Sequence, residues 1–188
     1  MKTAVLLVVT LALAATLVPA SSSAPAHPCV QKDELWFRAG DGTKLVGHRF
    51  GGKRPGQRTA VVLAHMSDGD LCVWAPFARS LARQGIFAFP FDFRGHGFSE
   101  GVLDHSLAAA DVRAAVGAVR RLGARKVVVV GASLGGIAAI VATPRIRPAL
   151  AGVVSVSGPA EIVGELNARP SAPRLRVPTL YLAAEQDQ

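Results

Sequence analysis

The chain has 188 residues, a formal net charge of +8 and a hydrophobic content of 50%. This length and apolar content suit one globular domain with a sizeable core. The arginines that supply most of the charge are scattered along the chain and are not interleaved with aromatic residues. No spacing typical of zinc ligands or RNA-binding motifs is present, which argues against a nucleic-acid-binding protein. We attribute the positive charge to a solvated surface.

The first 24 residues have the form of a secretory signal peptide. Lys2 provides a basic start, Ala4 to Val18 is apolar, and small residues between positions 20 and 26 offer cleavage sites. The apolar run is shorter than the ~20 residues that a membrane-spanning helix needs, so cleavage is favoured over a membrane anchor. We therefore expect a secreted, extracytoplasmic protein with no stable membrane insertion after cleavage.

The chain has two cysteines, Cys29 and Cys72. In an oxidising compartment an even count favours pairing, so one disulfide between them is expected. The bond would tie residues 25–33, an N-terminal arm with little periodicity, onto the domain that follows at 34–188. The alternative is two unpaired cysteines, one buried and one exposed.

The elements expected after the arm begin with a hairpin, in which strands 34–38 and 44–50 flank a Gly-rich turn. From residue 59 strands and helices alternate: strand 59–64, helix 74–84, strand 86–91, helix 106–122, strand 126–130, helix 133–142, and strands 151–156 and 179–183. The stretch 157–177 is expected to be irregular. Since the later strands are continuously apolar, a mostly parallel sheet covered by helices on both faces is predicted. Its chemistry is expected at the carboxyl ends of the strands.

The segment from Val127 to Gly136 is the most informative part of the chain. It consists of an apolar β-branched run, the pattern Gly-x-Ser-x-Gly at 131–135, and the start of a small-residue helix. This context predicts a nucleophile elbow that exposes the hydroxyl of Ser133. Gly131 and Gly135 would leave room where a Cβ would collide with the neighbouring strand and helix. The alternative is a Gly-rich turn that carries an incidental serine.

Four motifs in this order resemble the α/β-hydrolase family, in particular its serine esterases and lipases, over residues 34–188. Leu63–Met66 is similar to the family's oxyanion turn, Asp92–Ser99 to its Asp-x-Arg-Gly-x-Gly-x-Ser loop, 131–135 to its elbow, and Pro178–Asp187 to the strand and turn that carry its acid. The resemblance implies an α/β-hydrolase fold entered through an antiparallel hairpin. It also implies a serine hydrolase that acts on carboxylic esters or related acyl bonds of small molecules.

The resemblance assigns a role to each of several residues. Ser133 would be the nucleophile and Asp187 the carboxylate of the triad. The backbone N–H groups of Leu134 and Met66 would form the oxyanion hole, although many family members have glycine where this chain has Met66. The residues expected to brace the surrounding loops are His65, Asp92, Arg94 and His96. No metal ligand set or phosphate loop is recognisable, and no cofactor is expected.

The expected general base has no counterpart in the sequence. In the family order a histidine follows the acid, whereas the five histidines here, at 27, 48, 65, 96 and 105, all precede Ser133. The sequence therefore reads as a hydrolase domain incomplete at its C-terminus, lacking the final strand and helix. We expect the chain alone to be inactive or very weakly active. We also expect poor solubility, because strand 179–183 would present an unpaired apolar edge.

Two other functions remain open at this point. A non-catalytic interaction module could use the same fold, since fold does not determine function. An acyltransferase would pass the acyl group from Ser133 to an alcohol instead of water.

Overall fold

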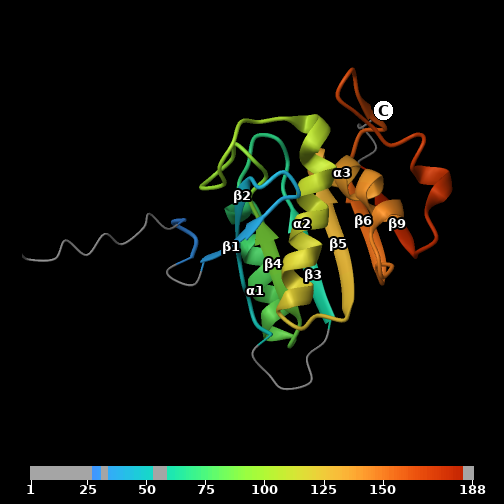
Figure 1. Ribbon diagram of the computed structural model, residues 1–188. Helices are drawn as coiled ribbons and strands as arrows, with labels where there is room; N and C mark the ends of the chain where they lie inside the picture. The colour runs from blue at the N-terminus through green and yellow to red at the C-terminus, as the bar shows by residue number, and fades with distance from the viewer. Residues whose placement is uncertain (1–26, 31–33, 53–58, 184–188) are drawn as a thin grey trace, which may run out of the picture.

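A computed structural model describes residues 27–30, 34–52 and 59–183. Its main sheet has seven strands in the order β1-β2-β4-β3-β5-β6-β9 (Figure 1). The strands are β1 Glu34–Arg38, β2 Lys44–His48, β3 Thr59–Ala64, β4 Phe87–Phe91, β5 Lys126–Ala132, β6 Gly152–Val156 and β9 Thr179–Leu182. β1 and β2 form an antiparallel hairpin, β2 is antiparallel to β4, and the other neighbours are parallel. This confirms the predicted mostly parallel sheet with an antiparallel N-terminal hairpin.

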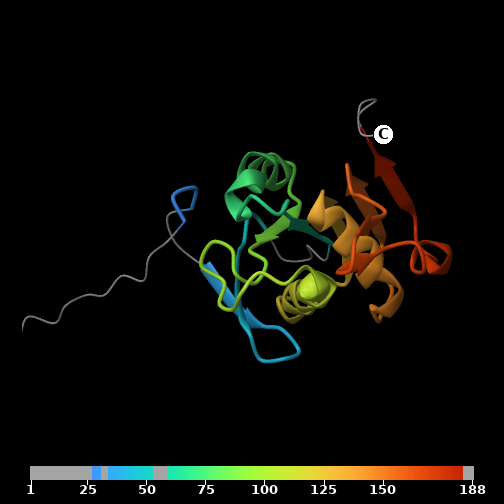
Figure 2. The same cartoon turned by 90° about the horizontal axis from the view of Figure 1, so that it is seen from above.

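Helices cover both faces of the sheet, and Figure 2 shows α1 and α2 on opposite sides of it. The α-helices are α1 Ala75–Arg83, α2 Ala108–Arg121 and α3 Leu134–Ala142, and short 3-10 turns lie at Leu71–Trp74, His105–Leu107 and Thr143–Arg145. One large cluster of buried side chains joins α2 and α3 to the sheet, and a smaller one lies under α1. None of the helices within the described ranges is long and apolar enough to cross a membrane.

The apolar strands are buried unequally on their two faces. In β5, Val127 and Val129 are fully buried in the large cluster, whereas Val128 and Val130 are only partly buried. Successive side chains of a strand point to opposite faces, so the α2–α3 face is covered more completely than the α1 face. A continuous run of valines thus fits a strand with apolar packing on both sides.

The stretch 157–177, expected to be irregular, contains a small hairpin. β7 Glu161–Ile162 pairs with β8 Leu166–Asn167, and a 3-10 turn follows at Ala172–Arg174. Gly164, with φ of 75°, allows the tight turn between the two strands. Strands of two residues are too short to produce an alternating pattern, which explains why the sequence did not indicate them.

Several strand ends also differ from the prediction by one or two residues. β5 continues past residue 130 to Ala132, because Gly131 and Ala132 pair with β6. β2 ends at His48, and Phe50 makes an isolated bridge to Ala88. The expected signal peptide and most of the arm lie outside the described residues, as does the end of the turn expected to carry Asp187.

Candidate active site

Ser133 alone forms the turn between β5 and α3. Its backbone has φ of 48° and ψ of −113°, a conformation that residues with a Cβ rarely adopt. The N–H of Ser133 donates to the carbonyl of Val156 at 2.9 Å, and its own carbonyl accepts from Ile137 N–H at 3.1 Å. Neighbours on both sides therefore hold the turn in place. The side chain is partly exposed, and its hydroxyl has no hydrogen-bond partner among the described residues.

Glycines allow the strand and helix around Ser133 to approach each other closely. A Cβ on Gly131 would overlap the carbonyl oxygen of Gly135, and a Cβ on Gly135 would overlap that of Ala64. Gly136 lies against Ser155, whose Oγ would be 2.7 Å from an added Cβ. Because two of these three obstacles are backbone atoms, which cannot rotate away, the geometry of the turn requires glycine at 131 and 135.

Two backbone N–H groups beside this turn have no acceptor in the described part of the chain: those of Met66 and Leu134. Leu134 is the first residue of α3, where the helix leaves its N–H groups without partners of its own. The N–H of Gly135 donates to the carbonyl of His65 at 3.1 Å, which brings the loop of Met66 against the start of α3. The structure thus places the two expected oxyanion donors on elements that touch at Ser133.

His65 is fully buried and uses both of its ring nitrogens. Nδ1 lies 2.6 Å from the carbonyl oxygen of Met66, and Nε2 accepts from the N–H of Phe93 at 3.1 Å. Burial lowers the pKa of His65 to about 4, so the ring is neutral, with its proton on Nδ1. His65 therefore connects the loop after β3 to the loop after β4.

His96 lies beside His65, with ring centroids 5.0 Å apart. Its Nδ1 is 3.1 Å from the carbonyl oxygen of Arg94, and its Nε2 is 2.8 Å from that of Ser67. His96 therefore joins the same two loops at a second point.

Asp92 is a further link between these loops. One carboxylate oxygen accepts from Leu71 N–H at 2.7 Å, and the other accepts from Phe98 N–H at 3.0 Å. The second oxygen also lies 2.7 Å from Nε2 of His27. Asp92 is fully buried, and this burial raises the pKa of its carboxyl group.

Arg94 does not pair with Asp92, although both were expected to brace the same loop. Its guanidinium contacts the buried Asp111 of α2, with the shortest distance 2.6 Å, and reaches Asp41 of the β1–β2 turn at 2.7 Å. The hydrogen bonds to Asp111 raise the pKa of Arg94, and Arg94 in turn lowers the pKa of Asp41. Arg94 thus connects its loop to a helix and to the hairpin.

The sequence interpretation gave no role to three acidic and basic residues of this network: His27, Asp41 and Asp111. Asp111 could have been noticed, because it is an isolated acid in the alanine-rich helix predicted at 106–122, and the structure places it on the buried face. The other two lie in an arm and a turn, where the sequence carries no periodic signal for burial.

Among the described residues, neither a triad acid nor a general base contacts Ser133. Asp187 lies outside the described residues. The described histidines are not hydrogen-bonded to Ser133: His27, His65 and His96 contact the groups given above, and Nδ1 of His105 lies 2.6 Å from a carboxylate oxygen of Glu165. Across the described ranges, no three His, Cys, Asp or Glu side chains gather as metal ligands would.

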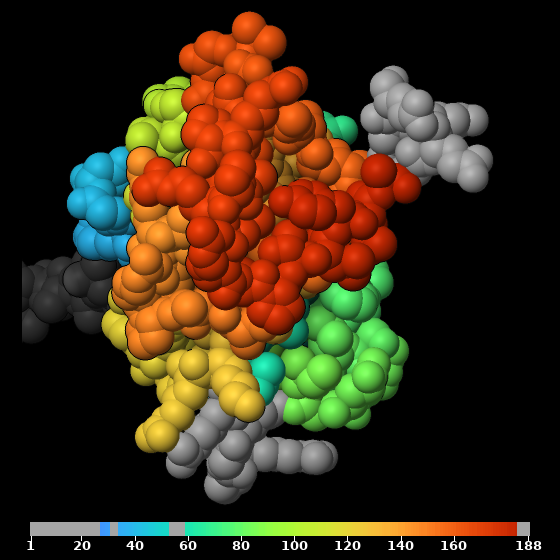
Figure 3. Space-filling model, turned by 90° about the vertical axis from the view of Figure 1, so that its right-hand side faces the viewer, coloured from blue at the N-terminus to red at the C-terminus, as the bar shows by residue number. Residues whose placement is uncertain are grey.

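A hollow of about 340 Å³ lies at the carboxyl ends of β6 and β9, lined by Ser155, Ser157, Gly158, Pro159, Tyr181, Leu182 and Ala183. A neighbouring hollow of about 310 Å³ shares Ser155 and Tyr181 and extends to Ile140 and Ala172. Figure 3 shows this side of the molecule, where the segment after β6 and strand β9 form the surface. Since Val156 binds the N–H of Ser133, the hollows begin next to the elbow.

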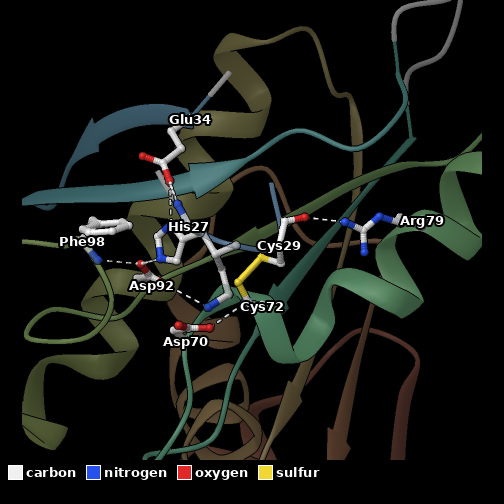
Figure 4. Close-up of a disulfide and its surroundings, with 9 residues drawn as sticks. His27, Cys29, Glu34, Asp70, Cys72, Arg79, Asp92 and Phe98 are labelled. Atoms are coloured by element: carbon white, nitrogen blue, oxygen red, sulfur yellow. Dashed lines mark hydrogen bonds and ion pairs between the residues drawn. A yellow bond between two sulfur atoms is a disulfide. The ribbon is translucent and has the colours of Figure 1, made fainter. Parts of the chain in front are cut away.

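The structure also pairs the two cysteines. Cys29 and Cys72 form a disulfide with a Cα–Cα distance of 5.5 Å (Figure 4). Cys72 lies in the loop 65–73, which also carries Met66, so the bond ties the described end of the arm to this loop.

A mostly parallel sheet whose inner strand delivers a strained serine to a helix N-terminus defines the protein as an α/β-hydrolase. Residues 55–170 match the family described as Serine aminopeptidase, S33. The chain belongs to this hydrolase family.

The curated relatives include the protein YfhR of Salmonella typhi, described as uncharacterized, which is 32% identical over 114 residues. That match covers 56% of this chain and 38% of the relative. The chain therefore spans less than half the length of the curated relatives it matches.

Similar solved structures include the esterase Pf2001 of Pyrococcus furiosus, with a TM-score of 0.70 and 18% identity over 80% of this chain and 69% of that chain. A putative aryl esterase from Burkholderia cenocepacia gives a TM-score of 0.58 and 26% identity over 69% of this chain and 48% of that chain. The first likeness establishes the fold alone, and both agree with the hydrolase family.

Proposed function

We propose that the protein is a secreted serine hydrolase that cleaves carboxylic esters or related acyl bonds, with Ser133 as the nucleophile. The observation that carries the proposal is the positive-φ backbone of Ser133, which presents a hydroxyl without a described partner. Strain of this kind is concentrated at functional sites. Secretion is supported by the signal-peptide form of residues 1–24 and by the disulfide, which persists in oxidising compartments.

In the proposed reaction the Ser133 oxygen attacks the carbonyl carbon of the ester while its proton passes to a general base. The carbonyl oxygen becomes an oxyanion, which the N–H groups of Met66 and Leu134 stabilise. The C–O bond to the leaving group then breaks, and the departing alcohol takes the proton. Water releases the acid from the acyl-serine by the same steps in reverse order.

The hollows beside the elbow support an acyl substrate of modest size. Their linings, of which Ile140, Pro159 and Ala172 are examples, are mainly uncharged, and Arg169 at one border is an exception. The similar structures include an esterase and a protein described as a putative aryl esterase, which supports a carboxylic ester as substrate.

We further propose Asp187 as the acid that orients the base, on the family-like spacing alone. His65 and His96 are poor candidates for the base, because each ring nitrogen already contacts a protein group. We therefore expect these 188 residues by themselves to react slowly at Ser133, and added imidazole to accelerate the reaction by supplying a base.

A fluorophosphonate probe, with the labelled peptide identified by mass spectrometry, tests the nucleophile. We expect labelling of Ser133 that rises with added imidazole and that falls to background in Ser133→Ala. Ser157→Ala is the matched control, because Ser157 is the other serine with positive φ in the described ranges. It should keep its label at position 133. A folded protein that stays unlabelled with imidazole would instead favour a non-catalytic module on the same fold.

A further inference from the structure

The described end of the N-terminal arm, residues 27–30, is tied to the protein by a buried histidine. His27 is 2% exposed. Its Nδ1 lies 2.6 Å from a carboxylate oxygen of Glu34, and its Nε2 lies 2.7 Å from Asp92 (Figure 4). The backbone N–H of His27 donates to the same Glu34 oxygen at 3.0 Å. Both ring nitrogens therefore face carboxylates, one at the start of β1 and one in the loop after β4.

A glycine makes the contact between His27 and Asp92 possible. Gly97 has φ of 52°, and a Cβ at this position would overlap a carboxylate oxygen of Asp92 and lie 2.6 Å from Nε2 of His27. The edge of the His27 ring also packs against Phe98, with centroids 4.5 Å apart. The loop after β4 is thus shaped to receive a side chain from the arm.

The arm has a second attachment, which is covalent. Cys29 is bonded to Cys72, its carbonyl accepts from the guanidinium of Arg79, and Val30 is 5% exposed (Figure 4). Cys72 follows Leu71, whose N–H is held by Asp92. His27 and the disulfide therefore act on the same short stretch of chain from two sides.

We propose that the arm positions the loop 65–73, which carries the N–H of Met66, and that the Cys29–Cys72 bond makes this positioning sensitive to reduction. Asp92 binds the N–H groups of Leu71 and Phe98 through its carboxyl oxygens, and Nε2 of His27 faces the oxygen that Phe98 binds. A buried carboxylate that loses its partner is strongly disfavoured. His27 is thus a positioning residue that acts through Asp92, and the catalytic part of the proposal rests on the function proposed above.

Reduction converts the bond into two cysteine thiols. A dithiol supplies two electrons and two protons and becomes a disulfide, whereas a phosphine supplies the two electrons and becomes a phosphine oxide, with the oxygen and the two protons coming from water. The arm is then held only by noncovalent contacts. Its departure would remove His27 from Asp92, and the loop 65–73 would lose an anchor.

Amide hydrogen exchange on the oxidised and reduced chain tests the positioning directly and needs no enzymatic activity. We expect exchange at Leu71 and Phe98 to become faster on reduction, by on the order of tenfold, while Val129 in β5 is unchanged. His27→Gln with the disulfide intact should show the same pattern. His105→Gln, which alters a histidine paired with Glu165 instead, is the matched control and should exchange like the wild type.

Two outcomes would overturn the proposal: exchange at Leu71 and Phe98 that is unaffected by both changes, or acceleration that includes Val129. The second result would mean that the arm stabilises the whole fold and does not specifically order this loop.

The rate of fluorophosphonate labelling at Ser133 gives the catalytic readout. Since misplacing a group at an active site by about 1 Å can cost ~10²-fold in rate, we expect at least a tenfold slower reaction after reduction, with little change in probe binding. Absence of labelling in every form would refute the proposed nucleophile, and the exchange data would still decide the role of the arm. If labelling of Ser133 became slower on reduction while amide exchange at Leu71 and Phe98 stayed unaltered, the proposed role of the arm would be contradicted.

Discussion

His65 connects the two loops beside the candidate site through both of its ring nitrogens. It is fully buried between the loops after β3 and β4. Its ring is neutral, because Nδ1 must donate to the carbonyl of Met66 while Nε2 must accept from the N–H of Phe93. Protonation would leave two donors, and the N–H of Phe93 would lose its acceptor. The carbonyl that His65 contacts belongs to Met66, so its charge state affects the loop proposed to bind the oxyanion.

The pKa of His65, lowered by burial from 6.5 to about 4, predicts acid sensitivity. Between these values the unfolded chain binds more protons than the folded one, so stability falls as the pH is lowered through this window. We expect His65 to contribute a loss of roughly 3 kcal/mol in the free energy of unfolding. Urea unfolding at a series of pH values measures it, and His65→Asn should lack this part of the slope. An unchanged slope in the variant would show that other groups cause it.

Residue roles could be predicted from the sequence where a local pattern carries them. The Gly-x-Ser-x-Gly pattern, with its flanking strand and helix, led to the strained turn at Ser133. No comparable pattern predicts that Arg94 pairs with Asp111 and Asp41. These partners lie on α2 and in the β1–β2 turn, and they come together only in the folded chain. The burial of His27 could not be predicted for the same reason, because its partner Asp92 is distant in the sequence.

At the scale of the elements, the turn at Ser133 depends on the close packing of α3 against β3 and β5. Gly131 and Gly135 permit backbone-to-backbone contact between β5, α3 and β3, and the N–H of Gly135 binds the carbonyl of His65. The distance between these elements therefore sets where the Ser133 hydroxyl lies.

Replacing Gly135 by alanine tests this close approach. The added Cβ would overlap the carbonyl oxygen of Ala64, so we expect a loss of about 3 kcal/mol or more in the free energy of unfolding. Gly117→Ala is the matched control, because it also changes a helical glycine but meets only Arg121, at 3.5 Å. That variant should be stabilised by about 0.5–1 kcal/mol. Similar losses in the two variants, measured by urea unfolding, would contradict the close-contact argument.

Most elements could be placed from the sequence because each has a strong period or a clear end. The valine run of β5 and the small residues of α3 indicate a buried strand and a closely packed helix. The pair β7 and β8 could not be recognised, since its two-residue strands depend on the turn at Gly164 and on burial of Leu166 against the large cluster.

At the scale of the whole molecule, β9 is the last strand of the described sheet, and it is poorly covered. Leu180, Tyr181 and Leu182 are 50%, 56% and 48% exposed. Exposed apolar strands at a sheet edge favour pairing between molecules. This arrangement supports the expectation of poor solubility.

A charge on this strand should reduce self-association. We expect Leu180→Lys to lower concentration-dependent light scattering while leaving the thermal unfolding temperature within a few degrees of the wild type. Val163→Lys is the matched control, because Val163 is 87% exposed at the tip of the β7–β8 hairpin, away from the strand. Equal effects of the two lysines would mean that net charge, and not the edge of β9, governs the association.

The connection between β6 and β9 has a consequence for how such a protein can diversify. Its tip at Gly164 is open to solvent, whereas its base, near Ala168 and Ala172, borders the hollow beside the elbow. Extra residues inserted at the tip would lengthen this hairpin and leave the turn at Ser133 undisturbed. In the proposed hydrolase, the segment that would set substrate selectivity is therefore separate from the turn at Ser133.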